Sequence, residues 1–207
     1  MMERVPMATG MFRKSIALAP LVLLTSCGIN SVPTAEEAAK AEWADVQAAF
    51  QSRANLIPNL QEIVTSASTQ ERDTLTDVIE ARARATSPQI RVEGEDLTDP
   101  AKVAAFAAAQ SQLSGSLGRL LATVEAYPEL KSQQNYGTFM SQIEGQENRI
   151  RIEIMDYNKA VQGYNTTIRT FPDIIGAKII HGAKPMVTYD APTEGAEVAP
   201  RVDMTPE

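Results

Sequence analysis

The chain has 207 residues, of which 43% are hydrophobic and only 5% aromatic, and its formal net charge is −7. This length suits one domain with additional ends, and a composition rich in alanine and leucine favours helices over strands. Because nucleic-acid binding requires a basic surface, the acidic balance argues against a nucleic-acid partner.

The start of the chain resembles a bacterial export signal. Arg13 and Lys14 precede an apolar run from Ile16 to Leu24, and either Met1 or Met11 can serve as its start. The run is too short to span a membrane, which takes roughly 20 helical residues. We therefore expect a cleaved leader and no permanent transmembrane helix here.

The apolar run ends in Leu24-Thr25-Ser26-Cys27-Gly28, which resembles the lipobox of bacterial lipoproteins. Cys27 is the only cysteine, so lipidation explains an exported thiol that has no intramolecular disulfide partner. The alternative is an ordinary signal peptide followed by a chance cysteine. We predict that diacylglycerol and fatty-acyl chains such as palmitate at Cys27 hold the body on a membrane, outside the cytoplasm. Gly28 stands where aspartate would favour the inner membrane, so the outer membrane is favoured for a Gram-negative source.

Four helices are predicted after this point. Thr34-Ala35-Glu36-Glu37 matches a capping box, which predicts that the first helix begins at Thr34. Pro58 lacks an amide donor, so we predict a break or sharp kink there, followed by a second helix that stops near Ser87-Pro88. Residues 89–98 are expected to form a loop. Asp99-Pro100 then supplies an N-cap and a first-turn proline for the third helix.

The third and fourth helices carry apolar residues at alternating steps of three and four, which is the period of a bundle seam. In the third helix, which Pro128 ends, the seam is Val103, Phe106, Gln110, Leu113, Leu117, Leu120, Val124 and Tyr127. In the fourth, which Pro172 ends, it is Tyr136, Met140, Ile143, Glu147, Ile150, Ile154, Tyr157, Val161, Tyr164, Ile168 and Phe171.

The predicted fold is all-α, an elongated antiparallel bundle of about four long helices with coiled-coil seams. Residues 1–26 are assigned to the lipoprotein signal peptide, 27–33 to a tether and 34–183 to the bundle. Residues 173–180 are expected to add one or two apolar turns that fold back over the bundle's end. Residues 184–207 contain prolines and acidic residues with little to bury, which predicts a disordered tail.

Five polar residues lie in or near the apolar seams: Arg53, Glu71, Arg82, Arg119 and Glu147. We interpret them as a polar network between helices that fixes their register, and a binding groove or switch is the alternative. Tyr157-Asn158 recurs as Tyr164-Asn165 one heptad later, and the two tyrosines are predicted to be core residues rather than ligand contacts.

Several motifs, in this order and spacing, resemble the LemA family. They are Arg53-Ala54-Asn55-Leu56-Ile57-Pro58-Asn59-Leu60, Ala81-Arg82, Leu113-Ser114, Arg119-Leu120-Leu121-Ala122, Val124 to Lys131, Glu147-Asn148-Arg149-Ile150, and Tyr157-Asn158 through Tyr164-Asn165-Thr166 to Phe171-Pro172. The resemblance implies an antiparallel bundle of long helices in a cell-envelope protein, and no agreed enzymatic activity. Family members usually carry an N-terminal membrane-spanning helix, which a lipobox replaces here, and Asn55 stands where aspartate is common.

Catalytic groups are few in this sequence. His181 is the only histidine, which is too few for zinc or di-iron ligand sets, and no phosphate-binding Gly-x-x-x-x-Gly-Lys loop is present. We therefore predict no catalytic residue, metal or cofactor, and expect a non-catalytic envelope adaptor that engages another envelope protein. The alternative is an envelope hydrolase or ligand-binding protein with a cryptic carboxylate site at Glu71 and Glu147.

Overall fold

The computed structural model describes residues 27–64, 69–125 and 134–190, and only the backbone of 27–28, 61–64, 69–72, 125 and 134–135. Four long helices make up most of it: α2 (Cys27–Val64), α3 (Thr69–Ala85), α4 (Pro100–Glu125) and α6 (Gln134–Thr167). The short elements are η1 (Pro88–Ile90), η2 (Gly94–Thr98), α7 (Asp173–Gly176) and the π-helical turn η3 (Ala177–His181). No strand occurs in these ranges, so the all-α prediction is confirmed.

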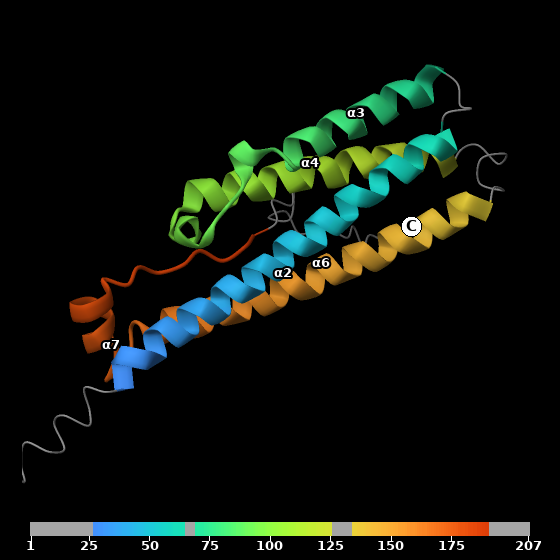
Figure 1. Ribbon diagram of the computed structural model, residues 1–207. Coiled ribbons are helices and arrows are strands. Elements are labelled where there is room, and N and C mark those ends of the chain that lie inside the picture. Colours follow the sequence, from blue (N-terminus) through green and yellow to red (C-terminus); the bar gives the residue numbers. More distant parts are fainter. Residues whose placement is uncertain (1–26, 65–68, 126–133, 191–207) are drawn as a thin grey trace, which may run out of the picture.

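Successive long helices run in opposite directions along a common axis (Figure 1). The 38 residues of α2 make a rod of about 57 Å, and α6 packs along it. The pair α3 and α4 covers only part of this rod. The rest is covered by η1, η2 and an extended segment, residues 184–190, which ends beside α4. The predicted elongated antiparallel bundle is therefore confirmed.

The buried apolar residues form two clusters, one on each side of Arg53. We call the cluster toward Cys27 the near core; its larger members are Val32, Trp43, Val46, Phe50, Val92, Leu97, Phe106, Tyr157, Val161, Tyr164, Met186 and Tyr189. The far core contains Ile57, Leu60, Leu75, Val78, Leu113, Leu117, Leu120, Val124, Tyr136, Phe139 and Ile143. Both take seam residues from α2, α4 and α6, so the predicted seams of the third and fourth helices are confirmed along most of their length.

The first helix begins earlier than the sequence suggested. Thr34 lies inside α2, where its hydroxyl donates to the carbonyl of Asn30 at 2.7 Å, so the predicted capping box and tether at 27–33 are wrong. Val32 is fully buried in the near core, and this tertiary contact extends the helix toward Cys27. Pro33 would leave the carbonyl of Ile29 without its helical donor, and Nε2 of His181 lies 3.1 Å from that oxygen.

Pro58 does not break α2, which continues to Val64, so the predicted break is wrong. The carbonyl that Pro58 deprives of a donor is that of Ala54, four residues earlier. Nε of Arg82, on the neighbouring helix α3, donates to this oxygen at 2.8 Å. The side chain of Arg82 thus replaces the missing backbone hydrogen bond and links α3 to α2 at the proline.

This compensation predicts an energetic coupling between Arg82 and Pro58. Arg82→Ala should lower the free energy of unfolding by about 1–2 kcal/mol, because it leaves the Ala54 carbonyl unpaired. With Pro58→Ala the restored amide takes over that carbonyl, so Arg82→Ala should then cost about 1 kcal/mol less. Denaturant unfolding of the four proteins measures the coupling, and additive losses would contradict it. Arg84→Ala, which removes an exposed arginine of α3, is the control.

The start of α4 follows the prediction, since the carboxylate of Asp99 accepts from the amide of Ala101 at 2.9 Å and Pro100 is the first helical residue. The turns at 173–181 pack against the start of α2, as expected. Phe171, however, is 72% exposed rather than buried, because α6 ends at Thr167 and the chain leaves the seam after Ile168.

The end of the described chain differs most from expectation. Residues 184–190 are not a disordered tail, since Met186 and Tyr189 are 5% and 3% exposed and complete the near core. The predicted disorder of residues 191–207, and the leader at 1–26, lie outside the described residues.

Candidate functional site

A layer of polar side chains around Arg53 separates the two cores. Arg53 is 1% exposed and comes from α2. Its Nη1 donates to Ser114 Oγ at 2.5 Å and to Glu147 Oε1 at 2.9 Å. Its Nη2 donates to the side-chain and main-chain oxygens of Gln110 at 3.0 and 3.2 Å. The guanidinium therefore joins α2 to α4 and α6 in one plane.

Gln110 extends this layer to α3. Its Nε2 donates at 3.0 Å to the carbonyl of Ala85, the last residue of α3. The guanidinium carbon of Arg53 lies over the ring of Phe50, 5.1 Å from its centroid, so the guanidinium also contacts the near core through a cation–π interaction. A buried charge is tolerated only with such partners, and a one-turn slip of any of these helices would remove them. The layer fixes helix register.

The remaining residues of the predicted network lie apart from this layer. Arg82 binds the carbonyl of Ala54, as described above. Arg119 is exposed, and its Nη2 lies 3.2 Å from Ser116 Oγ on its own helix. Glu71 is in α3, and its side chain lies outside the described residues, as does that of Cys27, the first residue of α2. The structure thus joins Arg53 to Glu147, and it joins Arg82 to the carbonyl of Ala54, the residue after Arg53.

A second arrangement, which sequence reasoning did not foresee, holds residues 184–190 against α6. Each asparagine of the repeated Tyr-Asn pair binds both backbone groups of one residue. Asn165 donates to the carbonyl of Met186 at 2.8 Å and accepts from its amide at 2.9 Å. Asn158 does the same with Tyr189, at 3.0 and 2.8 Å. We call these contacts, with those of the two tyrosines, the clasp.

The tyrosine hydroxyls complete the clasp. Tyr157 donates to the carbonyl of Val187 at 2.7 Å, and Tyr164 donates to that of Lys184 at 3.0 Å. On the opposite side, the amide of Val187 donates to the carbonyl of Leu97 at 2.8 Å. Burial raises the pKa of both tyrosines, so the phenols keep the protons that they donate.

The spacing of the clasp follows from chain geometry. Asn158 and Asn165 are seven residues apart, which is about 10.5 Å along an α-helix. Met186 and Tyr189 are three residues apart, which is about 9–10 Å of extended chain. A Tyr-Asn pair repeated after one heptad therefore matches every third residue of an extended segment. The repeat that the sequence displays is a device for binding backbone in extended conformation.

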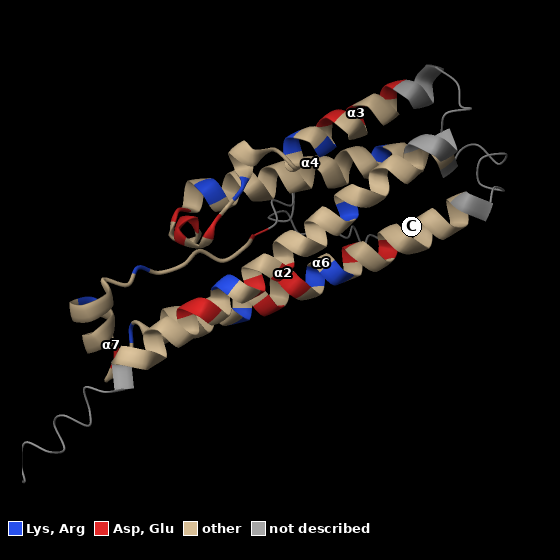
Figure 2. Cartoon of the chain, viewed as in Figure 1, with Lys and Arg blue, Asp and Glu red and all other residues tan. Residues whose placement is uncertain are grey.

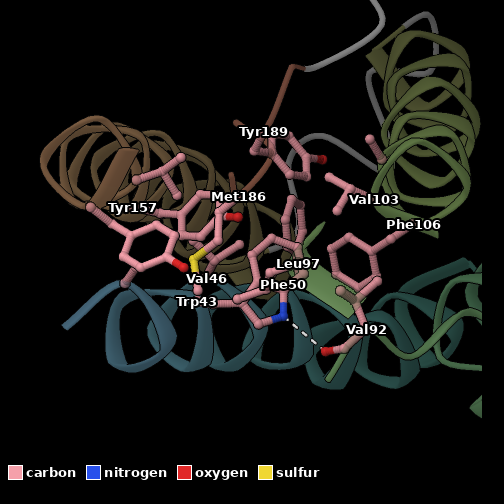
Figure 3. Close-up of a cluster of buried hydrophobic side chains, with 14 of the residues drawn as sticks. Trp43, Val46, Phe50, Val92, Leu97, Val103, Phe106, Tyr157, Met186 and Tyr189 are labelled. Carbon is pink, nitrogen blue, oxygen red and sulfur yellow. Dashed lines mark hydrogen bonds between the residues drawn. The ribbon is translucent and has the colours of Figure 1, made fainter. Parts of the chain in front are cut away.

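The aromatic rings of the near core surround the end of the clasped segment (Figure 3). Tyr189 lies with ring centroids 5.9 Å from Phe50 and 6.4 Å from Phe106 and Trp43. Trp43 in turn donates from Nε1 to the carbonyl of Val92 at 2.9 Å. Burial raises the pKa of Tyr189 to about 12. Tyr157 and Tyr164 are core residues, as predicted, and they are also the donors that hold residues 184–190.

A cavity of about 580 Å³ opens beside Trp43, between α2, α4 and the η1–η2 loop. Its polar lining includes Lys40, Gln47, Arg91 and Gln110. Glu147, one of the two carboxylates considered for a cryptic site, does not line this cavity.

Three carboxylates gather on the surface between α2 and α6. Oxygen atoms of Glu42, Asp45 and Glu153 lie within 4.8 Å of one another. Partial burial and then the nearby charges of Asp156, Asp45 and Glu153 raise the pKa of Glu42. Acidic groups on a surface commonly gather without a ligand, so we assign no metal here.

The raised pKa of Glu42 predicts that the stability of the folded chain depends on pH. Its protonated form is favoured in the folded chain, so stability is lost as pH rises through that pKa and the carboxylates repel. Glu42→Gln should therefore raise the melting temperature by about 1–2 °C at pH 7. The gain should vanish below pH about 4, where the carboxylates are protonated. Calorimetry at both pH values checks this, with Glu37→Gln, whose carboxylate pairs with Lys40, as the control.

These features define a class of elongated helical proteins, with a core divided by an arginine layer and a C-terminal segment clasped by asparagines. The LemA family model matches residues 42–204, and the chain belongs to the LemA family. Among the described residues, no helix combines the length and apolar character that crossing a membrane requires.

Three curated proteins are similar to this chain. Magnetosome protein MamQ 2 of Paramagnetospirillum magneticum is 26% identical over 69% of this chain and 58% of its own length. Magnetosome protein MamQ of Magnetospirillum gryphiswaldense is 25% identical over the same shares. Protein LemA of Metamycoplasma hominis is 26% identical over 61% of this chain and 52% of its own length. The chain thus spans little more than half the length of these relatives.

Proposed function

We propose that this LemA-family protein is a non-catalytic adaptor of the cell envelope, tethered by lipid at Cys27 and engaging another envelope protein. The observation that carries the proposal is the clasp, which fixes the chain up to Tyr189 on the side of the rod, at a defined distance along α2 from Cys27. Residues 191–207, which follow this segment in the sequence, carry four acidic residues and one basic residue.

The distance of the clasped segment from Cys27 follows from the contacts of Tyr189. Its ring packs on Phe50, which is 23 residues along α2 from Cys27, or about 35 Å of helix. An acidic segment presented there suits a basic surface on a membrane-associated partner. The layer around Arg53 lies at the next turn of α2 and keeps this platform rigid.

The alternative of a hydrolase with a carboxylate site at Glu71 and Glu147 has less support. Oε1 of Glu147 accepts a charged hydrogen bond from Arg53, and His181 contacts the backbone of Ile29 rather than a nucleophile. Glu147 and His181 therefore serve the fold.

Crosslinking in whole cells, followed by quantitative purification, tests the adaptor. The intact protein should enrich one or a few envelope proteins, and a chain truncated after Asp190 should lose them while remaining in the membrane fraction. Replacement of all four acidic residues of the tail by glutamine or asparagine should give the same loss. Equal enrichment with intact and truncated chains would remove the tail from the proposal, and no enrichment in any form would overturn the adaptor itself.

The tether has a separate test. Cys27→Ala should shift the protein from the membrane fraction to soluble or unprocessed forms, since it removes the lipid acceptor. A Cys27→Ala protein that is processed and still sediments with membranes would overturn the anchor. Ser26→Ala, which keeps a small residue before the cysteine, is the matched control and should be lipidated normally.

A further inference from the structure

The turns at the tethered end of the rod expose apolar side chains that no other element covers. Of the eight large apolar residues with high exposure among the described side chains, five lie at this end: Ile29, Phe171, Ile175, Ile179 and Ile180. Ile179 and Phe171 are 79% and 72% exposed. We call this set the apolar tip. A group of this kind on a water-soluble body marks an interaction surface.

The α7–η3 turns have an exposed apolar side and a buried side. Ile175 and Ile179, four residues apart, are exposed, as is Phe171, which lies two residues before α7. Gly176 and Ala177 on the other face are buried against the bundle. The segment is therefore amphipathic, with its apolar side directed away from the protein.

Two hydrogen bonds hold the tip against the first turns of α2. Ser31 Oγ donates to Asp173 Oδ1 at 2.6 Å, and His181 Nε2 contacts the carbonyl of Ile29 at 3.1 Å. Because α2 begins at Cys27, the tip lies within one or two helical turns of the proposed lipid. Figure 1 shows α7 beside the start of α2, at the end of the rod opposite to the α3–α4 pair.

The charge around the tip differs from that of the whole chain. Between residues 169 and 184 the basic residues are Arg169, Lys178 and Lys184, and Asp173 is the only acidic one, although the chain carries a net −7. Figure 2 shows basic residues on this segment, whereas acidic and basic residues are mixed along α2 and α6. Exposed isoleucines flanked by lysines are the composition of segments that lie in an anionic membrane interface.

We propose that the apolar tip inserts into the surface of the anionic membrane to which the protein is tethered. The tip then adds a second contact beside the lipid at Cys27, and the rod stands on the membrane in a fixed orientation instead of swinging on its anchor. This inference rests on the tether proposed above, but it concerns different residues.

Tryptophan substitutions in the full-length mature protein test the insertion. Phe171→Trp and Ile179→Trp each place an indole at the tip, and Ile152→Trp places one at an exposed apolar site in the middle of α6. The parent chain, with Trp43 buried, gives the background. Each protein is reconstituted on vesicles of phosphatidylcholine with phosphatidylglycerol, with or without brominated acyl chains.

The expected result is a blue-shifted emission at positions 171 and 179 and quenching by the brominated lipid, with neither change at position 152. Lys178→Glu combined with Lys184→Glu should cause loss of this quenching on anionic vesicles. Equal quenching at positions 152, 171 and 179 would overturn the proposal. A blue shift that depends on protein concentration without vesicles would overturn it in favour of a second copy of the chain on the tip.

A thiol titration of the purified protein separates this proposal from the tether. A free thiol at Cys27 would overturn the lipid anchor alone. The same thiol would then be coupled to a maleimide phospholipid, and the tryptophan measurements would be repeated on that tethered protein. Quenching at the tip would support insertion without a native lipid, and its absence would overturn the tip.

Discussion

Replacing Arg53 with alanine should lower the free energy of unfolding by about 3–5 kcal/mol, the largest loss expected for one side chain of the bundle. The change empties a large buried volume between the two cores and leaves Gln110 and Ser114 without their donor. A loss of this size corresponds to a fall in melting temperature of roughly 10 °C. Circular dichroism during heating measures it, with Arg151→Ala, an exposed arginine of α6, as the control.

The partner substitution distinguishes a register layer from a ligand site. Glu147→Gln should cost only about 1 kcal/mol, because the amide oxygen still accepts from Arg53 and the native side chain is 43% exposed. If Arg53→Ala also cost less than about 1 kcal/mol, the layer would not fix register. If Glu147→Gln abolished an envelope phenotype while unfolding stayed unchanged, the carboxylate would have a direct function instead.

Loss of both clasp asparagines is the second large effect. Asn158→Ala with Asn165→Ala removes four backbone-directed hydrogen bonds, each of which contributes about 1 kcal/mol. Residues 184–190 should detach, exposing Met186 and Tyr189 and opening the near core. Hydrogen exchange should show the amides of Met186 and Tyr189 losing their protection, while those of the far core keep theirs.

A single isosteric change provides a sharper version of this test. Asn165→Asp keeps the acceptor for the amide of Met186 but replaces the donor to its carbonyl with a repelling oxygen. It should speed exchange at Met186 more than at Tyr189, which Asn158 still holds. Asn148→Asp, on the exposed face of the same helix, is the control. Unchanged exchange at Met186 would show that packing alone retains the segment.

The periodic parts of the fold could be predicted from the sequence. The three-and-four alternation in α4 and α6 reports which side chains face the core, and burial of that stripe is what stabilises a long helix. The N-cap at Asp99 could be predicted as well, since the residues that form it are close together in the chain. For the same reason the polar residues in register with the seams could be recognised as candidates before their partners were known.

The failures have a common physical cause, which is that distant residues supplied what the local pattern lacked. Pro58 should end a helix by itself, but Arg82 replaces the lost donor from a different helix. Residues 184–190 lack a helical or strand periodicity, but Asn158 and Asn165 bind their backbone while Met186 and Tyr189 enter the near core. The Tyr-Asn repeat at heptad spacing was the available signal, but its partner is an extended segment that no periodicity could locate.

The clasp also constrains the order in which the protein can acquire its structure. Val32 lies near the start of the described chain and Met186 near its end, and both belong to the near core. A ribosome or an export channel delivers a chain from its N-terminus, so almost all of it must emerge before this core can close. The far core needs only residues from Ile57 to Ile143 and can form earlier. The near core therefore closes last, after the far core already has the residues that it needs to pack.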